Sequence, residues 1–337
     1  MKKLFIPQYV QDGVRAIRIC LDGVQRLDLW GRADAQEAVH ARAMVEQTLA
    51  EVFRSEFPEL KLANGGLIAV SSEVDEGANE YGYNKIEGHP RAAVGAPNAT
   101  DIPESTVSGG RELRDVQSIY TAFSYTTQDV RHFRMGGVMD IISEKGSNAR
   151  EALDIQRDSL IAFGNQELGL HGFYNHVGLE VVSAATTAFT GDWNNSSRTG
   201  VEISDDFKLI VNQMMNGTEF VETPNTALFP TTVWNTLMDK LHNPTGGDRT
   251  VMDKLKSTYP MITKWDWEPK LNTAGKGGTP AVLVYNKDKR RQRVVRPMVA
   301  RALPPERAGL TFKVVLEERF GGVVMPKPKA HVRADGV

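Results

Sequence analysis

The chain has 337 residues, of which 41% are hydrophobic and 24% are charged, and its formal net charge is −2. These values are ordinary for a folded globular protein and exclude a disordered or collagen-like chain. Proteins dedicated to nucleic-acid binding usually carry a strongly basic surface, so the charge gives no whole-chain attraction to DNA or RNA. The length allows one large domain or two closely associated ones.

Cysteine usage and hydropathy restrict the setting. Cys20 is the single cysteine, which excludes an intramolecular disulfide and a cysteine-based zinc site. Near the N-terminus, the apolar run Leu4 to Ile6 is too short for the core of a signal peptide, and no stretch has the length of a transmembrane helix. We therefore expect no membrane association and a cytoplasmic setting.

The first part of the chain predicts an extended arm followed by a helix. Residues 1–34 show no long periodicity. In residues 35–57 the apolar positions recur every three or four residues, as in an amphipathic helix, and Pro58 ends the pattern. The positions are Ala38, Ala41, Val45, Leu49, Val52 and Phe53.

Short alternating stretches between Gly65 and Tyr125 predict a long hairpin-like β excursion, with segments at 67–70, 80–84 and 117–125. Its middle, Gly95 to Gly110, is dense in turn-forming residues and predicts the tip.

Two helix starts follow. Thr126 and Asp129 have the spacing of a capping box, and Asn148 with Glu151 repeats it. The apolar face after the second start predicts a helix that stops near Gly164, so the two helices together would form a long spine.

Beyond the spine, residues 164–204 are predicted to be loops. Helices are expected at 205–215, 230–241 and 251–257, and strands at 281–285 and 294–299. The Val-rich stretches 310–316 and 321–325 predict a terminal antiparallel pair.

A search for catalytic signatures finds no nucleophile elbow, P-loop, zinc-protease motif or dinucleotide fingerprint. The run Gly275 to Gly278 lacks the rest of a phosphate-binding motif, which favours a flexible turn. His171 and His176 lie near Glu167 and Glu180, but their spacing matches no standard metal motif, so a polar loop is favoured over a metal site. We expect no cofactor.

Four tryptophans are interpreted as core or interface anchors, because a base-stacking platform would need interleaved basic residues. They are Trp193, Trp234, Trp265 and Trp267.

Two charged clusters are candidate interface residues. A basic run follows a predicted strand, and it favours either a solvated turn or an edge that pairs with acidic residues of a neighbouring subunit. An acidic cluster could be that partner, could be solvated, or could bind a cation. The candidates are Glu73, Asp75, Glu76 and Glu80 on the acidic side and Lys287, Lys289, Arg290, Arg291 and Arg293 on the basic side.

The order of these features resembles the major capsid proteins of tailed phages with the Hong Kong 97 fold, in a branch long catalogued only as a bacterial and prophage protein of unknown function. The resemblance covers most of the chain, and its most specific part is the glycine and asparagine signature at 164–176. The matching motifs are Phe57-Pro58-Glu59-Leu60, Gly77-Ala78, Tyr81-Gly82-Tyr83, Asp101-Ile102-Pro103, Phe123-Ser124-Tyr125-Thr126, Gly164-Asn165, Gly169-Leu170-His171-Gly172-Phe173-Tyr174-Asn175-His176 and Arg319-Phe320-Gly321-Gly322-Val323-Val324-Met325-Pro326.

Two features depart from the family pattern. Val177 stands where the family has proline, and residues 240–310 match only in outline.

The resemblance implies an α+β fold with an N-terminal arm at 1–34, a first helix at 35–63 and an extended β-loop at 64–125. It further implies a peripheral domain with the spine helix at 126–225, an axial domain at 226–305, and return strands of the peripheral domain at 306–337.

The implied function is that of a major capsid protein, a structural subunit that assembles as pentamers and hexamers into an icosahedral phage head around double-stranded DNA. The implied partners are other copies of the chain, a portal protein, a separate scaffolding protein and decoration proteins. The implied location is the virion capsid, assembled in the bacterial cytoplasm. No isopeptide cross-link and no enzymatic activity are expected.

Two other functions stay open on the sequence. An encapsulin, the shell protein of a bacterial nanocompartment, has the same fold. A cytoplasmic metal-dependent hydrolase or lyase could use the loop of His171 and His176.

Overall fold

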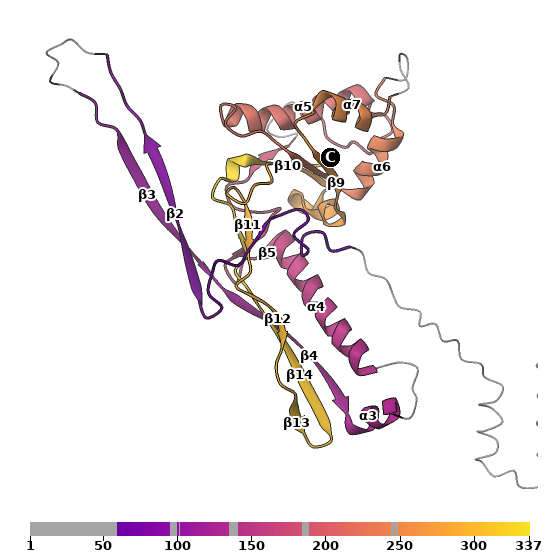
Figure 1. The fold of residues 1–337 in the computed structure, drawn as a ribbon. Coiled ribbons are helices and arrows are strands. Elements are labelled where there is room, and N and C mark those ends of the chain that lie inside the picture. The colour runs from indigo at the N-terminus through magenta and orange to yellow at the C-terminus, as the bar shows by residue number, and fades with distance from the viewer. Residues whose placement is uncertain are drawn as a thin grey trace, which may run out of the picture. The chain divides into compact units, whose positions relative to one another are not determined.

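The computed structural model describes residues 59–94, 100, 102–134, 141–183, 189–243, 246 and 249–337. These residues belong to one compact unit, Phe57–Val337. The predicted arm at 1–34 and all but the end of the predicted first helix lie outside the described residues, as does Cys20. Figure 1 shows the arrangement of the elements.

The spine begins as the sequence predicts. Helix α3 spans Thr127–Arg134. The amide of Asp129 donates to the hydroxyl of Thr126 at 3.2 Å, and the amide of Thr126 donates to the carboxylate of Asp129 at 3.0 Å. This reciprocal pair confirms the capping box.

The second predicted start is wrong. Helix α4 spans Ile141–Phe163 and continues without a break through Asn148, so the Asn148–Glu151 spacing is not a cap. Gly146 lies within the helix, where a side chain at its position would meet the ring of Phe123 at 3.6 Å. That distance is an ordinary van der Waals contact, so the packing of α4 on the neighbouring strand does not by itself require glycine there.

The glycine and asparagine signature caps the C-terminal end of α4. The amides of Phe173 and Tyr174 donate to the carbonyls of Ile161 (2.7 Å) and Ala162 (3.0 Å), and the side-chain amide of Asn175 donates to the Phe163 carbonyl at 2.7 Å. Three carbonyl groups that the helix leaves without partners are thus satisfied.

Glycine is needed at two points of this turn because the chain folds back so closely. Gly164 has a φ of 68°, and a Cβ there would lie 2.3 Å from the Leu170 carbonyl oxygen. A Cβ at Gly172 would lie 2.3 Å from the Phe163 backbone. The short strands β5 (Gly164–Asn165) and β6 (Leu170–His171) pair across the turn.

A five-stranded mixed sheet forms the centre of the second half of the chain. Its order is β7-β16-β10-β8-β9. The strands are β7 (Glu180–Val182), β16 (His331–Asp335), β10 (Ala281–Tyr285), β8 (Thr226–Phe229) and β9 (Lys264–Trp267). Strand β10 matches the prediction, and all its residues are buried, as expected for a central strand covered on both faces.

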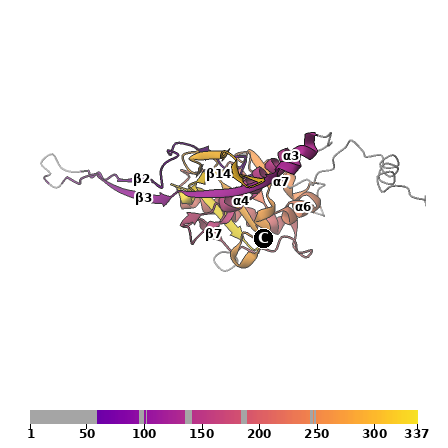
Figure 2. The same cartoon turned by 90° about the horizontal axis from the view of Figure 1, so that it is seen from below.

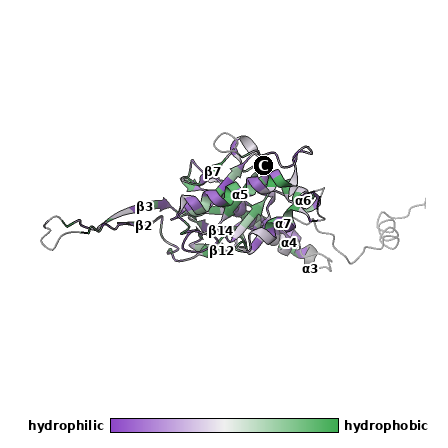
Figure 3. Ribbon diagram, turned by 90° about the horizontal axis from the view of Figure 1, so that it is seen from above, coloured by the Kyte–Doolittle hydropathy of each residue, from purple (hydrophilic) through white to green (hydrophobic). Residues whose placement is uncertain are grey.

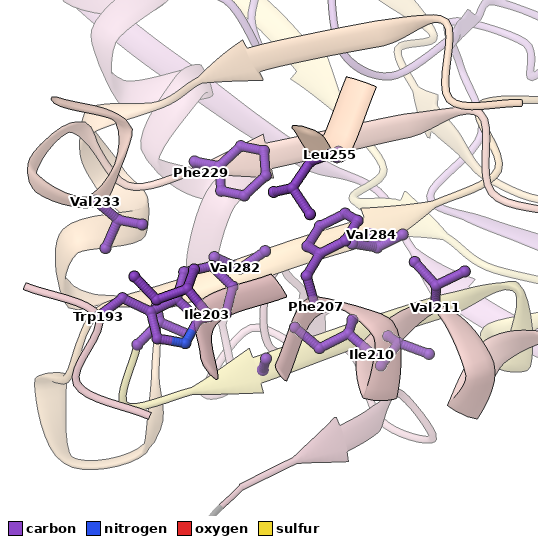
Figure 4. Packing of buried hydrophobic residues seen from close by; sticks show 14 of the residues in the cluster. Trp193, Ile203, Phe207, Ile210, Val211, Phe229, Val233, Leu255, Val282 and Val284 are labelled. Atoms are coloured by element: carbon purple, nitrogen blue, oxygen red, sulfur yellow. The ribbon is translucent and has the colours of Figure 1, made fainter. Parts of the chain in front are cut away.

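Helices cover one face of this sheet. They are α5 (Gly200–Gly217), α6 (Thr231–Asp239) and α7 (Val251–Thr258). In Figure 4 Phe207 and Ile210 of α5 lie against Val282 and Val284 of β10, within the larger hydrophobic core. Hydrophobic and hydrophilic residues alternate along α5 in Figure 3, as in a helix with one buried face.

Of the three helices predicted beyond the spine, α5 differs most from the structure. Helices α6 and α7 lie where the sequence predicts them, within two residues at each end. Helix α5 begins five residues before the predicted start, because Thr199 and Glu202 form a second capping box inside the predicted loop. Two 3₁₀ helices, η1 (Pro269–Thr273) and η2 (Lys276–Gly278), follow β9.

The other face of the sheet packs in a second hydrophobic core. This core joins the end of α4 and the turn after it to residues of β10 and of the segment around Leu67, with Phe173 and Tyr285 at its centre. The phenol of Tyr285 donates to the Leu67 carbonyl at 2.8 Å.

A second sheet lies beside α4 and contains β4 (Gln117–Thr126), β12 (Met298–Ala302), β13 (Glu306–Ala308) and β14 (Thr311–Phe320). The predicted strand 294–299 is divided here, since β11 (Arg293–Val295) pairs elsewhere and Pro297 separates it from β12. Strand β14 pairs with β4 over ten residues on one side and with β12 and β13 on the other.

The predicted terminal antiparallel pair is wrong. All of the predicted stretch 310–316 except Leu310 belongs to β14, whose partner along its length is β4. Strand β15 (Val323–Val324) pairs with β11. Strand β1 (Val70–Ser71) completes that small sheet. The sequence also gives no sign of β16, which follows η3 (Pro328–Ala330). Alternating apolar and polar residues predict a strand, but they do not show which distant strand pairs with it.

The predicted β excursion is confirmed as a hairpin of β2 (Glu80–His89) and β3 (Thr106–Asp115), paired over ten residues. Its third predicted segment, 117–125, lies instead in β4. Residues 106–110 of the predicted tip belong to β3. In Figures 1 and 2 the hairpin extends away from the other described elements.

A buried ionic group joins α4 to the second sheet. Glu318 of β14 is fully buried, and its carboxylate accepts two hydrogen bonds from Arg157 of α4, at 2.9 and 3.0 Å. Arg296, in the link between β11 and β12, lies 2.7 Å from the same carboxylate. Asp154 pairs with the outer side of Arg157 at 2.8 Å and is partly exposed.

We predict that Arg157→Met lowers the free energy of unfolding by about 3–5 kcal/mol, because it leaves a buried carboxylate without its main partner. The matched control Asp154→Ala removes the exposed partner of the same arginine and should cost less than about 1 kcal/mol. Urea unfolding of the unassembled subunit measures both. Equal losses in the two variants would contradict this account.

Candidate functional site

One face of the β2–β3 hairpin is a polar ladder whose groups bind one another. The carboxylate of Glu112 accepts hydrogen bonds from Tyr83 and Lys85 and lies 3.4 Å from Arg114. The hydrogen bond from Lys85 lowers the pKa of Glu112, while burial and the neighbouring carboxylate raise the pKa of Tyr83 to about 12. Farther along the same face, His89 and Ser108 lie 3.0 Å apart.

The opposite face of the hairpin carries apolar side chains and glycines, interrupted by the exposed register partners Asn84 and Arg111. Ile86, Val107 and Leu113 are 74%, 70% and 58% exposed. They share this face with glycines because side chains alternate along each strand. The guanidinium group of Arg111 lies over Gly82, where a Cβ would come within 2.6 Å of its Nε atom. The hairpin therefore presents three apolar side chains, called the apolar strip below, that nothing in the described part of the chain covers.

The base of the hairpin is fixed to the body of the subunit. The phenol of Tyr81 donates to the Gly321 carbonyl at 2.7 Å, and burial raises its pKa. Arg319 of β14 donates to the Asn79 side chain at 3.1 Å and to the Glu76 carbonyl. These bonds fix the direction in which the apolar strip faces.

The structure brings part of the predicted acidic and basic clusters together within one chain. Glu73 lies 2.7 Å from Lys289 and 3.2 Å from Arg293. The hydrogen bond from Lys289 lowers the pKa of Glu73, and the charge of Arg293 lowers it further. These three charges are therefore already paired inside the subunit.

The remaining basic candidates have different environments. Lys287 donates to the Gly66 carbonyl at 2.6 Å, and burial lowers its pKa. Arg291 pairs with the buried Glu222, whose hydrogen bond raises the pKa of Arg291, and with Asp288. Arg290 is exposed, and its amide donates to the Asp288 carboxylate at 2.9 Å.

The remaining acidic candidates are all exposed around the base of the hairpin. Asp75 accepts from the Gly77 amide at 2.8 Å, Glu76 lies 3.5 Å from Arg301, and Glu80 stands opposite Asp115 at the start of β2. Whether these charges also contact another subunit stays a prediction.

The two histidines considered as metal ligands lie in the turn after α4, with ring centroids 5.3 Å apart. No group of three or more His, Cys, Asp or Glu residues in the described ranges is placed to hold a metal ion. Burial lowers the pKa of His176 to about 4 and that of His331, fully buried beside Gln292, to about 3. The imidazoles of His176 and His331 are therefore neutral at pH 7.

We predict that acid destabilises the fold through these histidines. Their pKa values are below the usual 6.5, so the unfolded chain binds protons that the folded chain does not, and stability is lost as the pH falls from 6.5 towards 4. At pH 5 the loss is roughly 2 kcal/mol for each histidine. Urea unfolding at pH 7 and pH 5 measures it.

His176→Asn should reduce that loss, whereas the control His89→Asn, at an exposed position, should leave it unchanged. Glu268 acts in the opposite direction, because burial raises its pKa to about 7. Glu268 is present in the variant and in the wild type. The difference between their losses of unfolding free energy from pH 7 to pH 5 is therefore due to His176. An unchanged loss in His176→Asn would contradict the assignment.

The Gly275–Gly278 run forms a turn, as predicted, with positive φ at Gly277 and Gly278.

Three of the four tryptophans pack in the larger core: Trp193 is fully buried, and Trp234 and Trp265 lie against its edge. Trp267 is partly exposed, and the ammonium group of Lys61 lies 3.7 Å from its ring centroid.

No helix in the described ranges is long and apolar enough to cross a membrane.

Charge alone directed the choice of candidate residues, and it missed the apolar strip of the hairpin. The signal was available in the sequence, since Gly82, Ile86 and Gly88 alternate with polar residues along residues 80–89. Such alternation on a strand predicts two chemically different faces. The pairing of Arg157 with Glu318 had no comparable signal, because 160 residues separate them.

Solved structures of similar architecture are capsids. The capsid of Myoviridae phage XM1 matches with a TM-score of 0.72 and 18% identity, over 91% of this chain and 99% of that chain. The capsid of the native GTA particle matches at 0.62 and 12%, over 90% and 99%. The virus-like particle from Pyrococcus furiosus matches at 0.51 and 11%, over 82% and 98%. No curated protein sequence matches the chain.

The fold is thus the α+β fold of Hong Kong 97-type capsid subunits, as the sequence predicts. The sequence profile of the major capsid protein family matches residues 91–337. The chain belongs to the major capsid protein family, and its role is that of a structural subunit of a phage capsid.

Proposed function

We propose that this subunit assembles with copies of itself, as pentamers and hexamers, into an icosahedral head that encloses double-stranded DNA. The observation that carries the proposal is the uncovered apolar strip of the β2–β3 hairpin, formed by Ile86, Val107 and Leu113. A second copy is the partner that a shell subunit always has beside it.

The physics of the hairpin supports this assignment. A two-stranded hairpin is marginally stable in water, and this one extends without a core of its own. Its polar face satisfies its own charges, which leaves the apolar face as the source of binding free energy. Covering one Ile or Leu side chain contributes roughly 1.5–3 kcal/mol. Weak contacts of this size, repeated around closed rings, add up through multivalency and stay individually reversible.

We assign the parts of the chain as the resemblance implies. The arm is 1–34, the first helix is 35–63, and the extended β-loop lies within 64–125. The peripheral domain is built on α4 and the sheet of β4 and β14. The resemblance implies an axial domain at 226–305 and return strands of the peripheral domain at 306–337. We depart from it by adding α5, β7 and β16 to the axial domain, since β7 and β16 share the five-stranded sheet and α5 shares its core with residues 226–285.

The proposed partners beyond the chain itself are a portal protein, a separate scaffolding protein and decoration proteins. A net charge of −2 suits a wall that encloses DNA without adhering to it. Assembly in the bacterial cytoplasm and the absence of an enzymatic activity belong to the same proposal.

The encapsulin alternative is less supported, because the family match is to major capsid proteins.

The test of self-assembly compares Ile86→Ser with Glu87→Ser, neighbours on opposite faces of β2. Ile86→Ser should leave folding intact, since the side chain is exposed. It should also raise the subunit concentration needed for assembly about tenfold to a hundredfold, because the strip loses one buried side chain. Glu87→Ser should assemble like wild type. Light scattering against concentration, with negative-stain microscopy of the products, measures both.

Shells or capsomer rings formed by the wild-type chain support the proposal. Uniform small particles at all concentrations would refute it, and equal behaviour of the two variants would refute the role of the strip.

A further inference from the structure

A second uncovered apolar feature lies at the loop between α5 and β8. Phe220 and Val221 are 64% and 71% exposed, adjacent to each other and outside both hydrophobic cores. Large apolar side chains at a loop tip are unfavourable in water and are typical of the anchors that dominate protein interfaces.

The loop holds these side chains in a fixed, strained backbone. Glu219 and Phe220 have φ angles of 52° and 64°, a region that favours glycine. The amide of Phe220 donates to the Met215 carbonyl at 2.7 Å, and the amide of Val221 donates to the Thr218 carbonyl at 3.0 Å. A tip held in this way loses little conformational entropy when it binds.

The base of the loop is buried and surrounded by cations. Glu222 is buried, pairs with Arg291 and lies 3.5 Å from Lys327. Helix α5 also contacts η3, seen in yellow beside it in Figure 1. The exposed cations of the two adjoining loops, apart from Lys289 with its partner Glu73, are Arg290, Lys327 and Lys329.

A hollow of about 520 Å³ lies along the exposed side of α5. The half-buried Leu209 lines it, with the exposed carboxylates of Glu202 and Asp205 beside it and Lys208 as the one cation of its lining. The hydrogen bond from the Thr199 amide lowers the pKa of Glu202. Asp206 is buried in the wall and accepts from the indole of Trp193 at 2.9 Å.

We propose that Phe220 and Val221 of one copy insert into the α5 hollow of a neighbouring copy, with the cations around the loop facing Glu202 and Asp205. An aromatic anchor with a basic rim fits a hollow that offers the side chain of Leu209 inside an acidic rim. The proposal rests on the self-assembly proposed above and names a contact within it.

Geometry makes this contact head-to-tail. The hollow is lined by residues 202–212 of α5, whereas Phe220 follows the C-terminal end of the same helix, whose 18 residues span about 27 Å. Phe220 therefore projects from the opposite end of the helix from Glu202 and Asp205. Because anchor and hollow are different patches, the contact cannot form a symmetric dimer, and repeating it produces a ring where the rotation between copies closes.

Photo-crosslinking tests the contact in assembled particles. Subunits carrying Phe220→p-benzoylphenylalanine, which keeps the aromatic ring, are mixed with isotope-labelled wild-type subunits before assembly. Irradiation should join residue 220 of one chain to residues 202–212 of a labelled chain, as identified by mass spectrometry. Crosslinks confined to one chain, or to other parts of the neighbour, would overturn the proposal.

A matched pair of variants separates binding from backbone strain. Phe220→Gly and Glu219→Gly both relax a positive φ, so both should keep or raise the melting temperature of the unassembled subunit. Phe220→Gly should raise the concentration needed for assembly at least tenfold, whereas Glu219→Gly, which keeps the anchor, should not. Assembly of Phe220→Gly at the wild-type concentration would overturn the proposal.

The two proposals fail in distinguishable ways. If the wild-type chain forms no rings or shells, self-assembly fails and this contact fails with it. If particles form and the crosslinks lie elsewhere, self-assembly stands and only the α5 contact is overturned.

Discussion

The carboxylate of Glu318 lies out of reach of water between Arg157 and Arg296, and the position of the hairpin depends on how that charge is compensated. A buried charge needs its partners in place, so the triad holds α4, β14 and the link between β11 and β12 in one arrangement. Strand β14 pairs with β4, and β4 continues through Val116 into β3. This ionic group therefore holds together the elements of the body on which the hairpin is fixed by Tyr81 and Arg319.

Local signals in the sequence predicted local structure well. The capping box at Thr126, the stop at Gly164 and the all-apolar strand 281–285 are confirmed, since each depends on neighbours a few residues away. Errors arose where distant segments decide the outcome. The spacing of Asn148 and Glu151 imitates a cap within a continuous helix, and the partners of β14 lie about 190 residues upstream and in the adjoining strands.

The candidate site shows the same limit. Charged clusters are conspicuous in a sequence, yet Glu73, Lys289 and Arg293 form pairs within the subunit. Uncovered apolar groups such as Ile86 and Phe220 resemble core residues in the sequence, and only the fold shows that nothing in the described part of the chain covers them. For a shell subunit, the residues that the fold leaves uncovered are the informative ones.

Residues 106–126 form one nearly continuous strand, because Val116 alone separates β3 from β4. A neighbour that pulls on the hairpin would therefore load the β4–β14 ladder along its length. In this shear geometry the ten residue pairs share the load and must yield together, whereas a perpendicular pull would unzip them one at a time. A pull along the hairpin would thus reach the body of the subunit without peeling its sheet apart.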